Sequence, residues 1–144
     1  MRRAALAVPV AAALLAGCAD PRALEREARV MVYEQLSTPD APVTVGPAVV
    51  RANYAMVAWT RTGPSGGRAL LKRQGSKWTF ALCGGAPMAK PETLAAAGVP
   101  EAEAKKLVNK LLLEEGRVDQ RRRDQIERWQ GLGAGVDCPA PKAG

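Results

Sequence analysis

The sequence predicts one α+β domain, in which an N-terminal helix packs on a four-stranded antiparallel sheet and two to three further helices follow. Three observations support this prediction. Apolar residues recur at helical spacing over 21–36 and again beyond residue 91. Residues 43–83 instead form short runs, partly alternating and interrupted by turn residues, as strands do. With 144 residues, 47% of them apolar, the chain is long enough for one domain with a core and too short for two.

The N-terminus has the layout of a secretory signal. Arg2 and Arg3 precede thirteen uncharged residues, from Ala4 to Ala16, and this run is too short to cross a bilayer comfortably as a permanent helix. The segment Leu15-Ala16-Gly17-Cys18 then resembles the lipobox of bacterial lipoproteins. This resemblance implies that residues 1–17 are a signal peptide and that Cys18 is the lipidated first residue of the mature chain. An ordinary signal cleavage nearby is the alternative.

The same resemblance bears on location. A lipidated chain is anchored on the periplasmic side of the bacterial envelope. Asp20 lies one position too late for the aspartate that favours retention in the inner membrane. The resemblance therefore favours the outer membrane.

The first helix is predicted over 21–36. Asp20 caps it, and Pro21 takes the first helical position, where a missing N–H costs nothing. Its apolar face is expected to cover the sheet and consists of Leu24, Ala28, Met31, Val32 and Leu36.

Two strands follow. The run from Val43 to Val50 contains Gly46 and Pro47, which predicts an edge strand because proline has no donor for a central ladder. The run from Tyr54 to Thr60 is apolar on both faces, which indicates a central strand.

A hairpin is predicted next, from Ala69–Arg73 and Lys77–Cys83 around a two-residue Gln74-Gly75 turn. Alternation places Trp78, Phe80 and Leu82 on one face, toward the first helix. It sends Cys83 to the opposite face, toward the C-terminal tail.

The C-terminal part has helical spacing. One short helix begins at Pro91 and ends before Gly98, and a second runs from Pro100 to Gly116. A third is capped by Asp119 and reaches about Gln130, with Ile126 and Trp129 inward and three consecutive arginines, Arg121, Arg122 and Arg123, outward. The inward stripe of the second helix is Ala104, Leu107, Val108, Leu111 and Leu112.

These elements define a domain over residues 18–130, followed by a Gly- and Pro-rich tail over 131–144. A helix followed by a meander that wraps it resembles the cystatin-like and nuclear-transport-factor-like folds. That likeness concerns fold and carries no function.

Once Cys18 is lipidated, Cys83 and Cys138 remain as an even pair in an oxidising compartment, which predicts a disulfide. Closing a loop of 54 intervening residues contributes about 4 kcal/mol in the chain-entropy model. The alternative is that both cysteines stay reduced and bind a soft metal such as Cu(I), with Met88 as a further sulfur ligand.

Charge is distributed unevenly. No acidic residue lies between Asp40 and Glu92, although the segment is rich in lysine and arginine. The basic face predicted from it, a candidate surface for an acidic protein patch or anionic lipid, comprises Arg51, Arg61, Arg68, Lys72 and Lys77. An ordinary solvated face is the alternative. Nucleic acid is not expected, because no binding module or exposed aromatic pattern accompanies the charge.

Catalysis has little support in the sequence. The chain contains no histidine, which removes His-based triads and the commonest general base. The glycine run 63–67 is followed by Arg68 and Ala69, where a phosphate-binding loop has Lys and then Ser or Thr, so we interpret it as a flexible loop. We expect a protein that is not an enzyme.

Several segments together resemble the copper uptake system-associated proteins, small proteobacterial envelope proteins. In order along the chain, they are Asp40-Ala41-Pro42-Val43-Thr44-Val45, Tyr54-Ala55-Met56-Val57-Ala58-Trp59, Gly67-Arg68-Ala69-Leu70-Leu71, Trp78, Leu82-Cys83, and Leu94 through Ala97-Gly98-Val99-Pro100. The resemblance covers most of the mature chain, and it implies a place beside copper-uptake machinery. It supplies no ligand set, and the absence of histidine argues against direct Cu(II) binding.

We therefore expect a lipid-anchored periplasmic accessory protein that is associated with copper uptake through an envelope protein partner. No bound cofactor is expected, although copper is the metal that the resemblance raises. Two alternatives stay open. One is a Cu(I) carrier that uses Cys83, Cys138 and Met88, and the other is a structural envelope lipoprotein whose basic surface faces lipid or protein.

Overall fold

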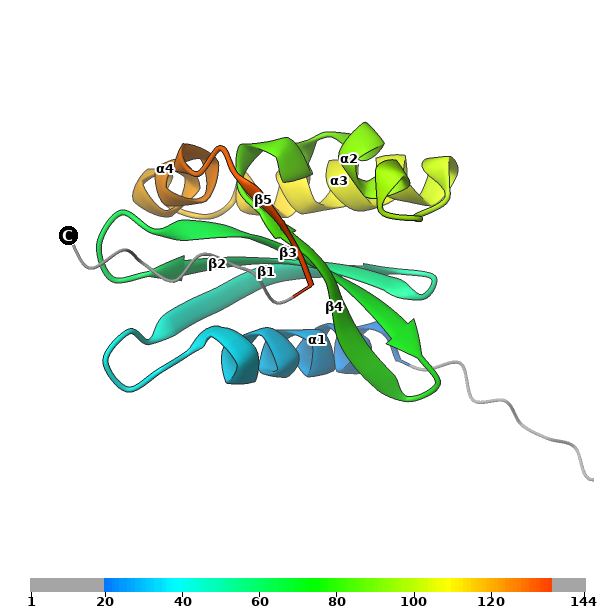
Figure 1. Cartoon of the computed structure of the whole chain (residues 1–144), viewed down its shortest axis with the longest axis horizontal. Coiled ribbons are helices and arrows are strands. Elements are labelled where there is room, and N and C mark those ends of the chain that lie inside the picture. The colour runs from blue at the N-terminus through cyan, green and yellow to red at the C-terminus, as the bar shows by residue number, and fades with distance from the viewer. Residues whose placement is uncertain (1–19, 136–144) are drawn as a thin grey trace, which may run out of the picture.

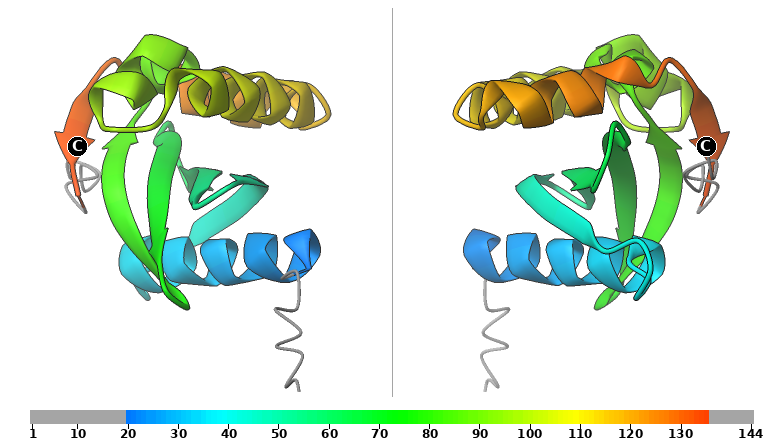
Figure 2. Two further views of the ribbon diagram at one scale, coloured as in Figure 1. Left: turned by 90° about the vertical axis from the view of Figure 1, so that its right-hand side faces the viewer. Right: turned by 90° about the vertical axis from the view of Figure 1, so that its left-hand side faces the viewer.

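The computed structural model describes residues 20–135, which form three layers (Figure 1). Helix α1 (Pro21–Leu36) covers one face of an antiparallel sheet, and the helices α2 (Pro91–Ala96), α3 (Glu101–Glu115) and α4 (Gln120–Arg128) cover the other. Figure 2 shows the curved sheet between these two helical layers. The predicted α+β class is confirmed.

Helix α1 has the bounds that its sequence predicts. The Asp20 carboxylate accepts a hydrogen bond from the Arg22 backbone N–H at 3.1 Å, which satisfies one of the unpaired donors at the helix start. The buried residues of the helix are Leu24, Ala28, Val32 and Leu36, at the expected spacing.

Within residues 20–135 the sheet has five strands in the order β1-β2-β3-β4-β5, and every neighbouring pair is antiparallel. The strands are β1 (Val43–Arg51), β2 (Tyr54–Arg61), β3 (Gly66–Gln74), β4 (Lys77–Gly84) and β5 (Leu132–Ala134). As predicted, β1 lies at an edge, where its pairing with β2 shifts between Val45 and Ala48, around Gly46 and Pro47. Strand β2 is buried along nearly its whole length, as expected of a central strand.

The fifth strand was not predicted. Strand β5 lies in the segment expected to be a tail, and it pairs with Leu82, Cys83 and Gly84 of β4. A run of three residues, Leu132-Gly133-Ala134, is too short to show an alternating pattern. The pairing exists because β4 presents its outer edge where the chain returns from α4.

A register shift in β4 changes the predicted faces. Leu70 pairs with Leu82 but Leu71 pairs with Phe80, so Ala81 is an extra residue in β4. Cys83 consequently joins Trp78 and Phe80 against α1, and Leu82 packs on the opposite face. The prediction that Cys83 lies opposite Phe80 is therefore wrong, because strict alternation does not survive a bulge.

The remaining helices follow a short 3-10 turn at Ala86–Ala89. In α3, Ala104, Leu107, Val108 and Leu111 are buried as predicted. Leu112 is 39% exposed, which corrects its place in the inward stripe, because the stripe on α3 is narrower than the sequence pattern suggests.

The glycine run before Arg68 is more than the flexible loop predicted from the sequence. Strand β3 already begins at Gly66, and a Cβ added there would lie 2.9 Å from the Gln125 backbone in α4. A Cβ on Gly67 would lie 2.8 Å from the Gly84 carbonyl oxygen. The two glycines therefore allow α4 and β4 to approach β3 closely.

The sheet has a separate core on each face. The core against α1 includes Trp59, Leu71 and Trp78, whereas the core against α2 and α3 includes Met56, Leu70 and Leu107. Within residues 20–135, no helix has both the length and the apolar character that a membrane crossing requires.

Candidate partner-binding site

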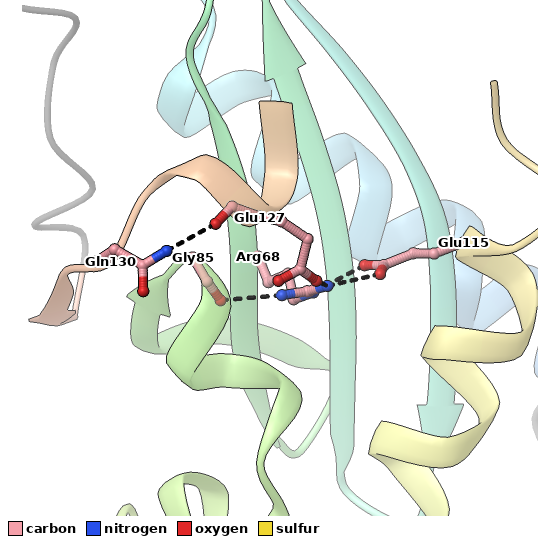
Figure 3. A network of polar contacts seen from close by, with 5 residues as sticks. All are labelled: Arg68, Gly85, Glu115, Glu127 and Gln130. Carbon is pink, nitrogen blue, oxygen red and sulfur yellow. Dashed lines mark hydrogen bonds and ion pairs between the residues drawn. The ribbon is translucent and has the colours of Figure 1, made fainter. Parts of the chain in front are cut away.

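Arg68, one of the predicted partner-binding residues, is completely buried at the centre of a polar network (Figure 3). Its Nε donates to Glu115 Oε1 at 2.8 Å, and its Nη2 donates to Glu115 Oε2 at 2.7 Å. Nη1 donates to the Gly85 carbonyl oxygen at 3.0 Å, and Nη2 also donates to Glu127. One guanidinium thus joins β3 to the end of α3, to α4 and to the segment after β4.

Two opposing effects act on the Arg68 pKa. Burial lowers the pKa, but the hydrogen bonds and negative charges of Glu115 and Glu127 raise it by more, so the net shift is upward. The guanidinium is therefore a fixed charge that is neutralised internally. Its contacts form a structural ion network. Because the Arg68 side chain is completely buried, a binding partner cannot reach its guanidinium.

Arg61 is also buried. Its Nη2 donates to the Leu36 carbonyl oxygen at 2.7 Å, and its guanidinium lies 5.5 Å from the centroid of the Trp59 ring. Burial lowers the Arg61 pKa. The side chain therefore caps the end of α1, whose last carbonyl groups have no partner within the helix.

The predicted basic face is therefore smaller than its sequence suggests. Arg61 and Arg68 are buried, which corrects their assignment to it, and Arg51 forms an ion pair with Glu103 at 2.8 Å. Lys72 and Lys77 are exposed. The absence of acidic residues between Asp40 and Glu92 does not make this surface basic, because the fold brings carboxylates of α3 and α4 to the arginines of the sheet.

The arginine run at the start of α4 is not uniformly outward. Arg122 turns toward the sheet, where its Nε donates to Thr60 Oγ1 at 3.1 Å and its Nη2 donates to the Gly46 carbonyl oxygen at 2.7 Å. Arg121 is exposed and Arg123 is half-buried. The outward prediction thus holds for Arg121 and is wrong for Arg122.

Cys83 and Met88, two sulfur residues of the alternative Cu(I) site, lie on opposite faces of the sheet. Cys83 is buried in the core against α1, and Met88 is buried in the core on the other face. Cys18 and Cys138 lie outside the described residues, so lipidation and the Cys83–Cys138 disulfide stay predictions. Across residues 20–135 there is no cluster of three or more His, Cys, Asp or Glu side chains suited to a metal ion.

The surface best suited to a partner is a groove between α1 and the start of β4, which we call the α1–β4 groove. Its volume is about 630 Å³. Its apolar walls include Val30 and Met31 of α1 and Trp78 of β4, and Val30 is 53% exposed. Trp78 is only 4% exposed, and its Nε1 has no acceptor among the residues that the structure describes.

The charges around the α1–β4 groove are balanced. Two of its cationic lining residues are Arg26 and Lys77, and two anionic ones are Glu27 and Glu34. Lys77 is the one member of the predicted basic face that lines this groove. The groove is therefore an apolar, electrically balanced surface on a chain whose formal net charge is +7.

Sequence reasoning missed the groove for an identifiable reason. The helical stripe in α1 predicts Met31 on the covered face, but Val30 lies outside that stripe and is apolar and exposed. The sequence signal for the groove was therefore Val30, an apolar residue outside the buried stripe of α1. Its significance depends on the hairpin end lying beside it, which only the fold establishes.

Comparison with protein-family models, with curated proteins and with solved structures finds no match in any of the three.

Proposed function

We propose that this chain is a lipid-anchored, non-enzymatic accessory protein on the periplasmic side of the bacterial envelope. In this proposal it assists copper uptake by binding a protein partner. The copper association rests on the sequence resemblance. The partner-binding role rests on the α1–β4 groove, in which a half-exposed Val30 lies beside Trp78.

The chemistry of the groove supports a protein partner. A partner that covers the half-exposed Val30 side chain removes apolar surface from water, and this burial favours the complex. Balanced charges at the rim add orientation without selecting a strongly charged ligand. The apolar residues that line the groove offer a surface for contact with a protein.

The place of the groove along the chain supports an envelope partner. Helix α1 begins at Pro21, and Ala23 lines the groove only five residues after the predicted lipid anchor at Cys18. A lipidated chain would therefore hold this groove within a short distance of the membrane surface. Such a position favours a partner that is itself embedded in or attached to the membrane.

Site-specific photo-crosslinking in intact cells tests the proposal. A photoreactive residue at Val30 is expected to give a discrete adduct with another envelope protein. The matched control is Leu113 on α3, which is 64% exposed and lies away from the groove. Adducts only at Leu113, or at neither position, would contradict the groove as the partner site.

Measuring copper accumulation in cells that lack the chain tests its proposed role in copper uptake. We expect reduced copper content at limiting external copper, restored by the unaltered chain and not by Val30→Glu. Unchanged copper content would remove the link to copper, and a Val30 adduct would still support partner binding.

A further inference from the structure

Among residues 20–135, the outer edge of β4 is only partly paired. Strand β5 pairs with Leu82, Cys83 and Gly84, and the Gly135 N–H reaches the Ala81 carbonyl oxygen at 3.1 Å. From Lys77 to Phe80, no strand among the described residues pairs with this edge. This open segment borders the α1–β4 groove, which Lys77, Trp78 and Thr79 help to line.

The backbone of Trp78 faces this open edge. Trp78 and Arg73 are opposite each other in the β3–β4 ladder, and the Arg73 N–H donates to the Asn53 carbonyl oxygen at 2.7 Å, on the side away from β4. The two residues therefore form a non-hydrogen-bonded pair, in which the backbone groups point away from the partner strand. The N–H and C=O of Trp78 are thus directed outward, where another strand can bind them.

We propose that the partner of the α1–β4 groove presents an extended segment, which adds to β4 beside Trp78 as a further strand. The inference rests on the proposed function and names the kind of partner that the site recognises. Main-chain hydrogen bonds to Trp78 supply affinity, and pockets for alternate side chains supply specificity.

The groove determines which side chains the segment carries. Strand neighbours alternate between the two faces of a sheet, so every second residue of the added strand points toward α1. Those residues meet Val30, Met31 and the Trp78 ring, and are expected to be apolar. The residues between them point away from α1 and are expected to be polar.

Two features favour a strand as the occupant. β5 already occupies the same edge of β4, so the added segment continues an existing line of strand pairing. The other edge of the sheet is less suitable, because Gly46 and Pro47 interrupt the regular pairing of β1 and proline lacks a donor. A helix in the groove would leave the outward groups of Trp78 without partners.

A phage-displayed library of random twelve-residue peptides, selected on the domain from residue 19 onward, tests the inference. That segment contains every described helix and strand and both cores. We expect enriched peptides to alternate apolar and polar residues with a period of two. An apolar spacing of three and four would indicate a helical ligand and would overturn the proposal.

Amide hydrogen exchange then locates the bound peptide. The Trp78 amide is expected to become protected when peptide is added. Protection that instead grows with protein concentration alone would show pairing between two copies of the chain, which would overturn the proposed occupant. Enriched peptides that leave the Trp78 amide unprotected would also overturn it.

Backbone methylation of the peptide provides the sharpest control. Methylating the one peptide nitrogen that faces Trp78 is expected to weaken binding by about tenfold or more, because it removes a hydrogen bond and adds a clash. Methylating the next nitrogen, which points away from β4, is expected to leave binding within about twofold. Equal effects at the two positions would argue against strand addition.

The variant Val30→Glu is expected to weaken peptide binding by about tenfold, whereas Leu113→Glu leaves it unchanged. Failure of the peptide experiments, together with a Val30 adduct in cells, would retain partner binding and reject the extended-strand mode. Failure of both would reject the proposed function.

Discussion

Arg68 shows how a single residue connects the layers of this molecule. Its side chain is fully buried. The Glu115 side chain, which accepts two hydrogen bonds from it in a bidentate ion pair, is only 7% exposed. A buried ion pair of this kind is costly to break from one side, because the remaining charge is left without a partner in a poorly solvated site. The pair therefore specifies how α3 and β3 meet.

Replacing Arg68 alone is expected to destabilise the fold strongly. Arg68→Met leaves the Glu115 carboxylate buried and unpaired, so the free energy of unfolding should fall by about 3–5 kcal/mol. Adding Glu115→Met should recover part of that loss. Chemical denaturation of the single and double variants measures both effects, and an additive double variant would contradict the coupling.

The matched control is Arg51→Met. Arg51 forms its ion pair with Glu103 while nearly half exposed, at 46% of its side-chain surface. Water and salt screen such pairs, so the expected change is about 0–1 kcal/mol. A loss at Arg51 as large as that at Arg68 would show that burial is not the cause.

Glu101 and Lys105 form an exposed pair at the start of α3, with 2.9 Å between carboxylate and ammonium. The hydrogen bond and charge of Lys105 lower the Glu101 pKa. Because the folded pKa is depressed, the stabilising contribution is present above the unfolded pKa and is lost as pH falls through the folded pKa. Carboxyl NMR titration should show the lowered Glu101 pKa, and Lys105→Ala should remove most of that shift.

At the scale of elements, the segment that connects α4 to β5 packs closely against the backbone of Gly85. The Ala86 N–H donates to the Trp129 carbonyl oxygen at 2.8 Å, and a Cβ on Gly85 would lie 1.9 Å from that same oxygen. Glycine is required here by space, because any Cβ at this position would overlap the Trp129 backbone. The segment after β4 and the end of α4 thus form one packed unit.

Gly85→Ala is expected to disrupt that unit. The added methyl group forces the Trp129 backbone to move, and overpacking of this kind costs about 1–3 kcal/mol. Hydrogen exchange should rise in β5 and α4 before it rises in β2. Gly116→Ala is the control, because its added Cβ is 3.3 Å from the nearest atom and it should change stability by less than about 1 kcal/mol. Equal losses for the two variants would contradict this account.

At the scale of the whole molecule, two cores share one sheet, and the predicted disulfide would tie the C-terminal segment to the core against α1. Cys83 is completely buried there, and its register partner in β5 is Gly133, five residues before Cys138. A covalent link from that site would restrict the unfolded chain over most of the second half of the sequence.

Thiol titration of the protein purified without reductant tests the disulfide. We expect Cys83 and Cys138 to react only after unfolding and reduction. Cys138→Ser should lower the free energy of unfolding by about 4 kcal/mol in the chain-entropy model, whereas Cys18→Ser in the non-lipidated chain should not change it. Reactive Cys138 in the unreduced, unfolded protein would contradict the pairing.

Local patterns predicted much of the fold. The bounds of α1 were correct because a proline after a capping aspartate and a regular apolar stripe act within the helix itself. The hairpin of β3 and β4 and the edge position of β1 were correct for the same reason. The predicted Gln74-Gly75 turn was wrong by one residue, because Gln74 pairs with Lys77 and leaves Gly75 and Ser76 as the turn. β5 and the bulge at Ala81 were missed, because each depends on a neighbouring strand.

The candidate site was less predictable. Lys77 was identified from its charge and does line the α1–β4 groove, but Arg61 and Arg68 were assigned to the surface and are buried. The difference comes from partners far along the chain, since Glu115 is 47 residues from Arg68. A one-signed segment indicates a charged surface only when no distant carboxylate reaches it.

The sequence by itself determined the α+β class, the helix that opens the domain and the turns of the meander, because propensity and periodicity are local properties. Only the tertiary structure decided which arginines are buried, which face Cys83 occupies and where the groove lies. Those features arise because α3, α4 and β5 pack against the sheet. Contacts between residues so far apart in the sequence produce no periodic pattern from which they could be predicted.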